Sequence, residues 1–152
     1  MRLVMMGAMA AVLLAGCGQR AEPQVEGAWV RLPAVEGRPA AAYFTLKAGG
    51  APVTLLSVRT PAAVRTELHE SMKGHGGMMT MKPLKQIDVA AGATLAFEPG
   101  AKHVMLFDVN PALKPGGEMV LTLAFADGKT VEAKAALRGA GDAGAGGHGA
   151  GH

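Results

Sequence analysis

The chain has 152 residues, enough for one domain with a buried core, and only 4% of them are aromatic, so Val, Leu, Ala and Met must build that core. The formal charge of +3 comes without a run of Lys or Arg, which argues against nucleic-acid binding. A Gly-rich phosphate loop, a Ser/His/Asp pattern and a reactive Cys/His pair are all missing from the sequence, so we expect a protein that is not an enzyme.

The N-terminus is typical of an export signal. Arg2 precedes a continuous apolar run over residues 3–15, which is too short for a membrane-spanning helix of roughly 20 residues. The stretch Leu14-Ala15-Gly16-Cys17 resembles the bacterial lipobox, where a lipoprotein signal peptidase cuts before a cysteine that is then acylated. We therefore predict a signal peptide over residues 1–16 and a periplasmic or cell-envelope protein anchored to the membrane by lipid on Cys17.

Cys17 is the only cysteine, so no disulfide can form within the chain. A soluble exported protein with a chance cysteine at the cleavage site is the alternative. Lipidation explains both why the thiol is present and why it is single, because a free thiol would be a liability in an oxidising compartment.

After a tether over residues 17–23, short β-like runs alternate with turn residues throughout residues 24–138. No window of twelve or more residues has a convincing helical period, although residues 110–114 could form one helical turn. About nine short strands with close turns predict an all-β, antiparallel sandwich or barrel. The runs are 24–31, 41–47, 53–60, 64–70, 78–82, 94–98, 103–109, 119–125 and 130–136.

Residues 139–152 are mostly Gly and Ala and have no side chains able to build a core, which predicts a flexible tail. The tail carries His148 and His152. Two interpretations remain open: an auxiliary arm that binds Cu(II) or Zn(II), or an incidental solvated end.

Four soft side chains are the candidate metal ligands: His69, Met81, His103 and Met105. Thioether sulfur is a poor ligand for zinc, calcium or magnesium and a good one for Cu(I). In a strand, alternation puts His103 and Met105 on one face while their neighbours enter the core. The alternative is that each Met fills the core and each His lies at the surface. A single site requires three strand ends to meet, and the sequence leaves that open.

The spacing of these residues resembles the PCu(A)C family of periplasmic copper chaperones, whose pattern is His, an optional Met, ten residues, Met, twenty-one residues and His-x-Met. Here ten residues, 71–80, separate Glu70 from Met81, and twenty-one, 82–102, separate Met81 from His103-Val104-Met105. The stretches Gly27–Arg31 and Ala42–Phe44 also resemble the family, so the likeness covers about residues 24–137. One departure is Glu70 in place of the optional Met, with Met72 two residues later.

The resemblance implies a cupredoxin-like Greek-key β-barrel that binds Cu(I) through the four residues. It also implies delivery of copper to the binuclear site of cytochrome c oxidase subunit II, beside Sco-type copper proteins. A copper-sequestering or resistance protein, or a structural lipoprotein without metal, are the competing hypotheses. His75, in a glycine-rich loop between two predicted ligands, is either an auxiliary entry ligand or simply solvated.

Overall fold

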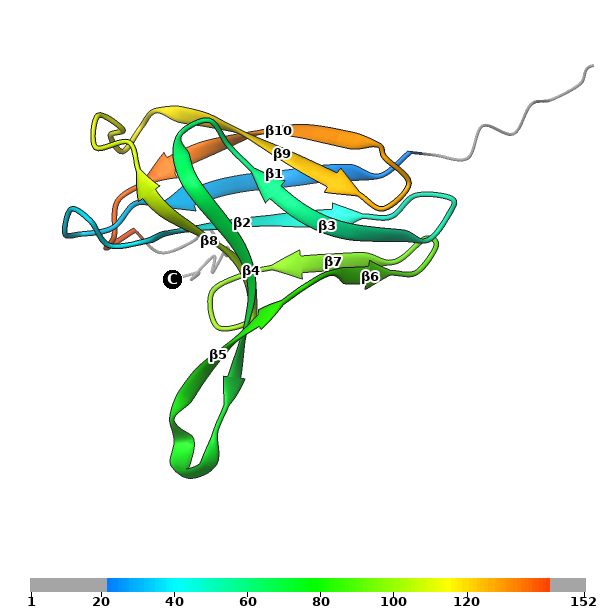
Figure 1. Cartoon of the computed structure of the whole chain (residues 1–152), viewed down its shortest axis with the longest axis horizontal. Helices are drawn as coiled ribbons and strands as arrows, with labels where there is room; N and C mark the ends of the chain where they lie inside the picture. Colours follow the sequence, from blue (N-terminus) through cyan, green and yellow to red (C-terminus); the bar gives the residue numbers. More distant parts are fainter. Residues whose placement is uncertain (1–21, 143–152) are drawn as a thin grey trace, which may run out of the picture.

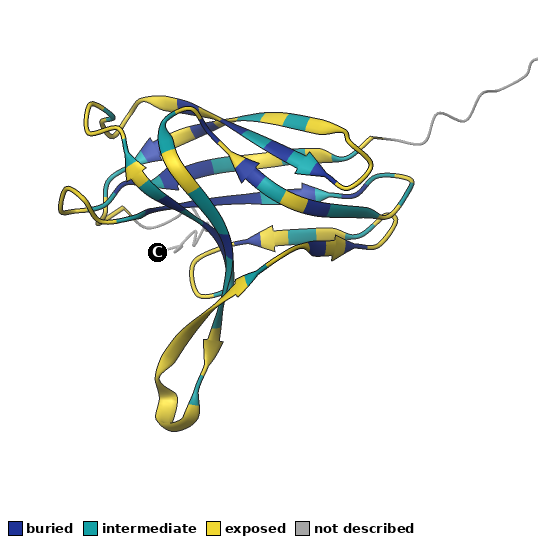
Figure 2. Cartoon of the chain, in the orientation of Figure 1, coloured by how far each residue is buried: buried dark blue, intermediate teal, exposed yellow. Residues whose placement is uncertain are grey.

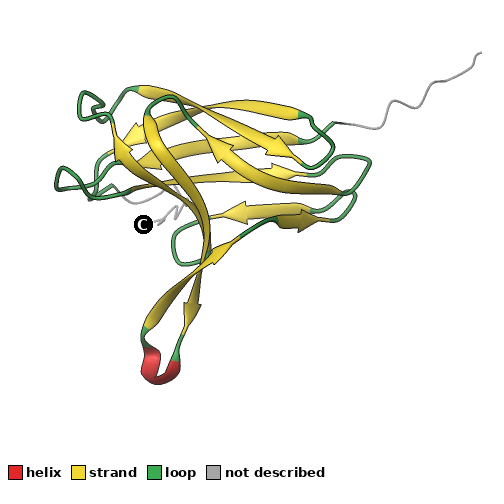
Figure 3. Ribbon diagram, viewed as in Figure 1, coloured by secondary structure: helices red, strands yellow, loops and turns green. Residues whose placement is uncertain are grey.

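Ten strands make up most of the described chain, residues 22–142 of a computed structural model (Figure 1). One short 3-10 turn, His75–Gly77, is drawn in red in Figure 3. The strands are β1 (Gln24–Arg31), β2 (Ala40–Lys47), β3 (Val53–Arg59), β4 (Ala63–Lys73), β5 (Met79–Leu84), β6 (Ile87–Val89), β7 (Thr94–Phe97), β8 (Lys102–Val109), β9 (Glu118–Phe125) and β10 (Thr130–Arg138).

The strands form one sheet in the order β5-β4-β8-β7-β2-β1-β10-β9-β3-β6, with β8 also pairing with β2. The β1–β10 and β7–β8 pairs are parallel, and the other pairs are antiparallel. Most neighbours are distant in sequence, so crossovers rather than simple hairpins connect the sheet. The sheet folds over so that β3 packs near β4 and encloses the core (Figure 1).

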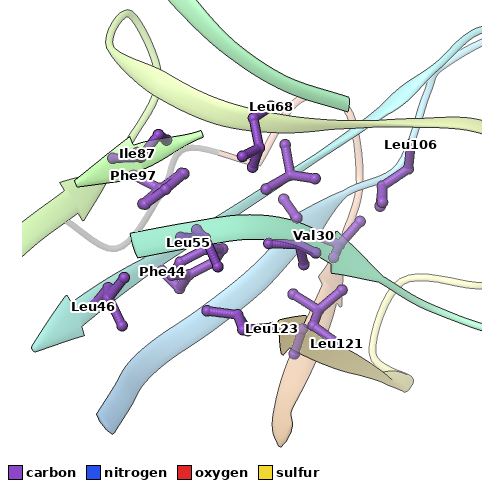
Figure 4. Close-up of a cluster of buried hydrophobic side chains, with 14 of the residues drawn as sticks. Val30, Phe44, Leu46, Leu55, Leu68, Ile87, Phe97, Leu106, Leu121 and Leu123 are labelled. Atoms are coloured by element: carbon purple, nitrogen blue, oxygen red, sulfur yellow. The ribbon is translucent and has the colours of Figure 1, made fainter. Parts of the chain in front are cut away.

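Alternation along the strands builds that core. On β8, Val104 and Leu106 are fully buried, while Met105 and Phe107 at the alternate positions are only partly buried. Aliphatic side chains dominate the cluster, and the rings of Phe44 and Phe97 stack with centroids 4.2 Å apart (Figure 4). The low aromatic content is therefore compensated by Leu and Val packing, as the composition predicts.

The hairpin formed by β4 and β5 projects from the barrel (Figure 1). Strand β4 is 11 residues long, and only its last three residues, 71–73, pair with β5 without also pairing with β8. Figure 1 shows the β4–β5 hairpin projecting from the barrel, and Figure 2 shows that its far end is largely exposed. The glycines of the tip permit the reversal, since Gly76 and Gly77 both have positive φ angles.

Each of the nine runs expected from the sequence corresponds to a strand. The expected number was too low because β6 was not recognised: it has three residues, too few to show an alternating pattern. The helical turn expected at residues 110–114 is wrong. That segment is a turn in which the Asn110 Oδ1 accepts a hydrogen bond of 2.9 Å from the Ala112 amide.

The predicted signal peptide, Cys17, His148 and His152 lie outside the described residues. Of the predicted tail, residues 139–142 are described and contain a turn closed by the Gly139 amide, which donates to Asp142 Oδ2 at 2.7 Å. Between residues 22 and 142, no helix is of a length and hydrophobicity that would let it cross a bilayer.

Replacing a central core side chain tests this packing. Leu106→Ala removes a fully buried side chain and should lower the free energy of unfolding by about 2–5 kcal/mol, measured by urea denaturation. Leu56→Ala, at an exposed Leu on β3, is the matched control and should cost less than about 1 kcal/mol. Equal losses for the two variants would contradict the burial pattern.

Candidate metal centre

The three strands that carry the predicted ligands lie next to one another, in the order β5-β4-β8. His69 on β4 is directly opposite His103 on β8, and their ring centroids are 5.9 Å apart. Met81 on β5 is opposite Ser71, two residues from His69, and therefore lies on the same face as the two imidazoles. Met105 follows His103 by two residues on that face. The register thus brings all four predicted ligands to one side of the sheet.

A cavity of about 260 Å³ opens on this side, and Met81, His103 and Met105 line it. His69 does not line the cavity, but its ring lies beside the ring of His103, which does. The loops around Pro33, Pro39 and Gly100 close the cavity, and so does Ala140 at the start of the predicted tail.

Exposure differs sharply among the ligands. His103 is only 4% exposed, whereas Met81, on the edge strand of the sheet, is 60% exposed. The site is therefore deep on the β8 side and open to solvent on the β5 side.

Each imidazole has one nitrogen held by the protein and one left free. His103 Nδ1 is 3.0 Å from the Ala101 carbonyl oxygen and donates to it, which leaves Nε2 buried without a partner. His69 Nε2 is 2.8 Å from Glu67 Oε2 and donates to it, which leaves Nδ1 buried without a partner. A buried acceptor without a hydrogen bond is costly and requires an explanation. Two such nitrogens beside two thioethers fit a soft metal ion.

His69 is kept neutral by its surroundings. Burial lowers the pKa of His69, and the positive charge of Arg65 lowers it further. Arg65 also pairs with Glu67, so the carboxylate that orients His69 is itself held in place. A neutral imidazole is the form that binds metal, and an oriented second nitrogen is the usual companion of a metal-binding histidine.

Glu70, at the position of the optional Met, takes no part in this arrangement. It follows His69 directly, so its side chain points to the opposite face of β4. There Glu70 Oε1 accepts a hydrogen bond of 2.6 Å from Lys102 Nζ. This bond and the charge of Lys102 lower the pKa of Glu70 and keep it ionised. The departure from the family pattern is therefore a structural ion pair.

Trp29 on β1 and Tyr43 on β2 form an aromatic wall behind the site. The Tyr43 ring lies 6.5 Å from the His103 ring and 4.5 Å from the Trp29 ring, measured between centroids. Trp29 belongs to a small cluster with Ala41 and Tyr43 rather than to the main core. Trp29 is buried behind Tyr43 and does not itself line the cavity. Its contact with Tyr43 depends on the pairing of β1 with β2, so the sequence reasoning did not identify this wall.

A bulge in β1 produces this wall. The register against β2 shifts between Glu26 and Trp29, where Gly27 has a φ of 60°. Strict alternation would put Trp29 on the same face as Val25. The extra residue instead turns Trp29 toward Tyr43 and sends Val30 into the core.

Two arginines, Arg31 and Arg138, place positive charge next to the aromatic wall. Arg31 lines the cavity and donates from Nη2 to the Tyr43 hydroxyl at 2.6 Å, while the guanidinium of Arg138 lies 4.6 Å from the Trp29 ring centroid. Burial raises the pKa of Tyr43 although Arg31 acts in the opposite direction, so the phenol stays protonated. No carboxylate within residues 22–142 forms an ion pair with either arginine.

His75, the predicted auxiliary ligand, lies in the exposed 3-10 turn at the hairpin tip, outside the lining of the cavity. Within the described part of the chain, no three side chains of His, Cys, Asp or Glu converge on one point. The two imidazoles and two thioethers thus remain the candidate donor set among the described residues.

A model of the family described as "Putative lipoprotein LpqE-like" matches residues 24–137. The protein named "Putative lipoprotein Lxx21020", from Leifsonia xyli subsp. xyli, is 31% identical over 107 residues, which is 70% of this chain. The chain spans 64% of the length of that relative.

Solved structures give the fold. The copper-bound PCuAC domain from PmoF2 has a TM-score of 0.65 at 20% identity, over 80% of this chain and 96% of that domain. The structure named CuI-DR1885, from Deinococcus radiodurans, has a TM-score of 0.63 at 31% identity, over 80% of this chain and 81% of that one. The predicted cupredoxin-like, all-β fold is confirmed.

The hydrogen bonds predict opposite tautomers for the two site histidines. In the metal-free protein at neutral pH, His69 should carry its proton on Nε2 and His103 on Nδ1, as measured by long-range ¹H–¹⁵N correlation NMR. Glu67→Ala should remove the tautomer preference of His69 and leave that of His103 unchanged. Finding the same tautomer at both residues would contradict the geometry.

Proposed function

Because the chain belongs to the LpqE-like, PCu(A)C-type lipoprotein family, we propose that it is an exported Cu(I)-binding metallochaperone with His69, Met81, His103 and Met105 as ligands. The observation that carries the proposal is the pair of buried imidazole nitrogens without partners beside two thioethers. The structure of CuI-DR1885, at 31% identity, supports the same metal and oxidation state.

The charges of the site favour Cu(I) over Cu(II). All four ligands are neutral, so they offer no negative charge to offset a second positive charge on the ion. Arg31 on the cavity wall and Arg138 beyond it repel a divalent ion twice as strongly as a monovalent one. Glu67 acts in the opposite direction, but Arg65 neutralises it.

The donor set also suits release. Without a thiolate, the site should hold copper less tightly than a cysteine site does, so a thiolate-rich acceptor can remove the ion. Met81 is exposed on an edge strand, where an acceptor can approach it. We propose delivery to the binuclear copper site of cytochrome c oxidase subunit II, alongside Sco-type proteins, from a position in the cell envelope held by lipid on Cys17.

Cu(I) titration tests the ligand set. The purified protein should bind one tight Cu(I) under anaerobic competition with a chromophoric chelator. The double variant His103→Ala/Met105→Leu should lower that affinity by about 100-fold or more, where each tenfold corresponds to about 1.4 kcal/mol. X-ray absorption of the loaded protein should report both sulfur and nitrogen ligands.

Met72→Leu is the matched control for this titration, since Met72 is exposed on the opposite face of the β4–β5 hairpin and should not affect the affinity. Unchanged binding by the double variant would exclude the assigned site. A chain that binds no Cu(I) at all would favour the structural lipoprotein.

Gene deletion tests delivery. Loss of the gene should lower cytochrome c oxidase activity, and added copper should restore it, because the acceptor site would otherwise remain unfilled. Complementation by the wild-type gene should restore activity, and complementation by the His103→Ala/Met105→Leu variant should not. Copper sensitivity with normal oxidase activity would instead indicate sequestration.

A further inference from the structure

The β4–β5 hairpin carries more exposed sulfur than the four-ligand site uses. Met72, Met78 and Met79 are all exposed, although methionine is usually a buried residue. They lie toward the outer end of the hairpin that projects from the barrel (Figures 1 and 2). Exposed thioethers next to a soft-metal site require a reason beyond packing.

The strand register sorts these side chains by face. Met79 is opposite Lys73 and Met81 is opposite Ser71, so both side chains lie on the face of His69. Met72 is opposite Thr80 and lies on the other face. Met79 is thus the one exposed methionine of β5 that shares both the strand and the face of Met81.

Met79 and Met81 repeat the spacing of the inner ligands. Two residues along a strand span about 7 Å, so Met79-x-Met81 on β5 presents two thioethers side by side, as His103-x-Met105 on β8 presents an imidazole and a thioether. The Met79–Met81 pair and the His103–Met105 pair lie on the same side of the sheet. Of the two methionines on β5, Met81 lines the cavity and Met79 does not.

We propose that Met79 and Met81 form an outer Cu(I) site through which the ion enters and leaves the inner site, an inference that rests on the proposed function. His103 is 4% exposed, whereas Met81 is 60% and Met79 is 53% exposed. An incoming ion therefore meets the thioethers first. Met81 remains bound while the bond from copper to Met79 sulfur breaks and a bond to His103 nitrogen forms.

This exchange needs no other reactant. The copper stays monovalent, and both the leaving and the entering ligand are neutral, so no electron or proton is transferred. Lys73, opposite Met79 on the same face, repels a bound cation and keeps the outer site weak. A weak outer site is what transit requires, because a tight one would retain the ion.

Exchange kinetics on the full chain test the proposal. Loading from a Cu(I)–chelator complex and unloading to excess chelator are followed by anaerobic stopped flow for wild type, Met79→Leu and Met72→Leu. A transit site accelerates both directions, so Met79→Leu should slow loading and unloading together by about three- to tenfold, equal to about 0.7–1.4 kcal/mol in the barrier. Met72→Leu, 46% exposed on the opposite face, should exchange at the wild-type rate.

Ligand signals identify the outer site separately from the rates. In the His103→Ala/Met105→Leu background, added Cu(I) should shift the methyl ¹³C resonances of Met79 and Met81 and leave that of Met72 unchanged. Wild-type rates in Met79→Leu, or equal slowing in both leucine variants, would overturn the outer site while leaving the copper function standing. Failure of the wild type to bind Cu(I) would instead overturn the proposed function.

Discussion

His69 and His103 face each other across the β4–β8 ladder, and the site depends on that pairing. The register is held by the neighbouring residues Leu68, Val104 and Leu106, which are buried in the core. A slip of one residue would send the histidines into the core and the aliphatic side chains to the cavity, at a large cost in hydrophobic free energy. The core of the barrel therefore positions the ligands through the strand register.

Hydrogen bonds to the two histidine rings add a second constraint. The Ala101 carbonyl fixes the ring of His103 from its own strand end, and Glu67 fixes His69 from two residues earlier on β4. Both orienting groups lie two residues before the histidines that they orient, so the free nitrogens are aimed before any metal arrives. The bulge at Gly27 completes the wall by turning Trp29 toward Tyr43.

Local patterns predicted those features that depend on one strand at a time. Alternation placed His103 and Met105 on one face and Val104 in the core, and the turn residues marked nearly every strand boundary. The meeting of the β4–β5 hairpin with β8 depends on pairing between distant segments, which no local pattern records. The bulge made the position of Trp29 unpredictable from alternation, because one inserted residue reverses the face of every later residue on the strand. Glu67 could have been found, since it precedes His69 by two residues in the same predicted strand.

The two sides of the site differ in strand pairing and in exposure, and this asymmetry fits a carrier better than an electron-transfer centre. His103 and Met105 come from β8, which is paired on both sides within the sheet, while Met81 comes from edge strand β5 of the projecting hairpin. A blue-copper centre uses a cysteine ligand in a closed site, and no cysteine occurs within residues 22–142. Ligands that are fixed on one side and exposed on the other allow an ion to be held and exchanged by substitution at the exposed side. Under the proposed function, the buried half of the site on β8 would hold the ion and the exposed half on β5 would pass it on.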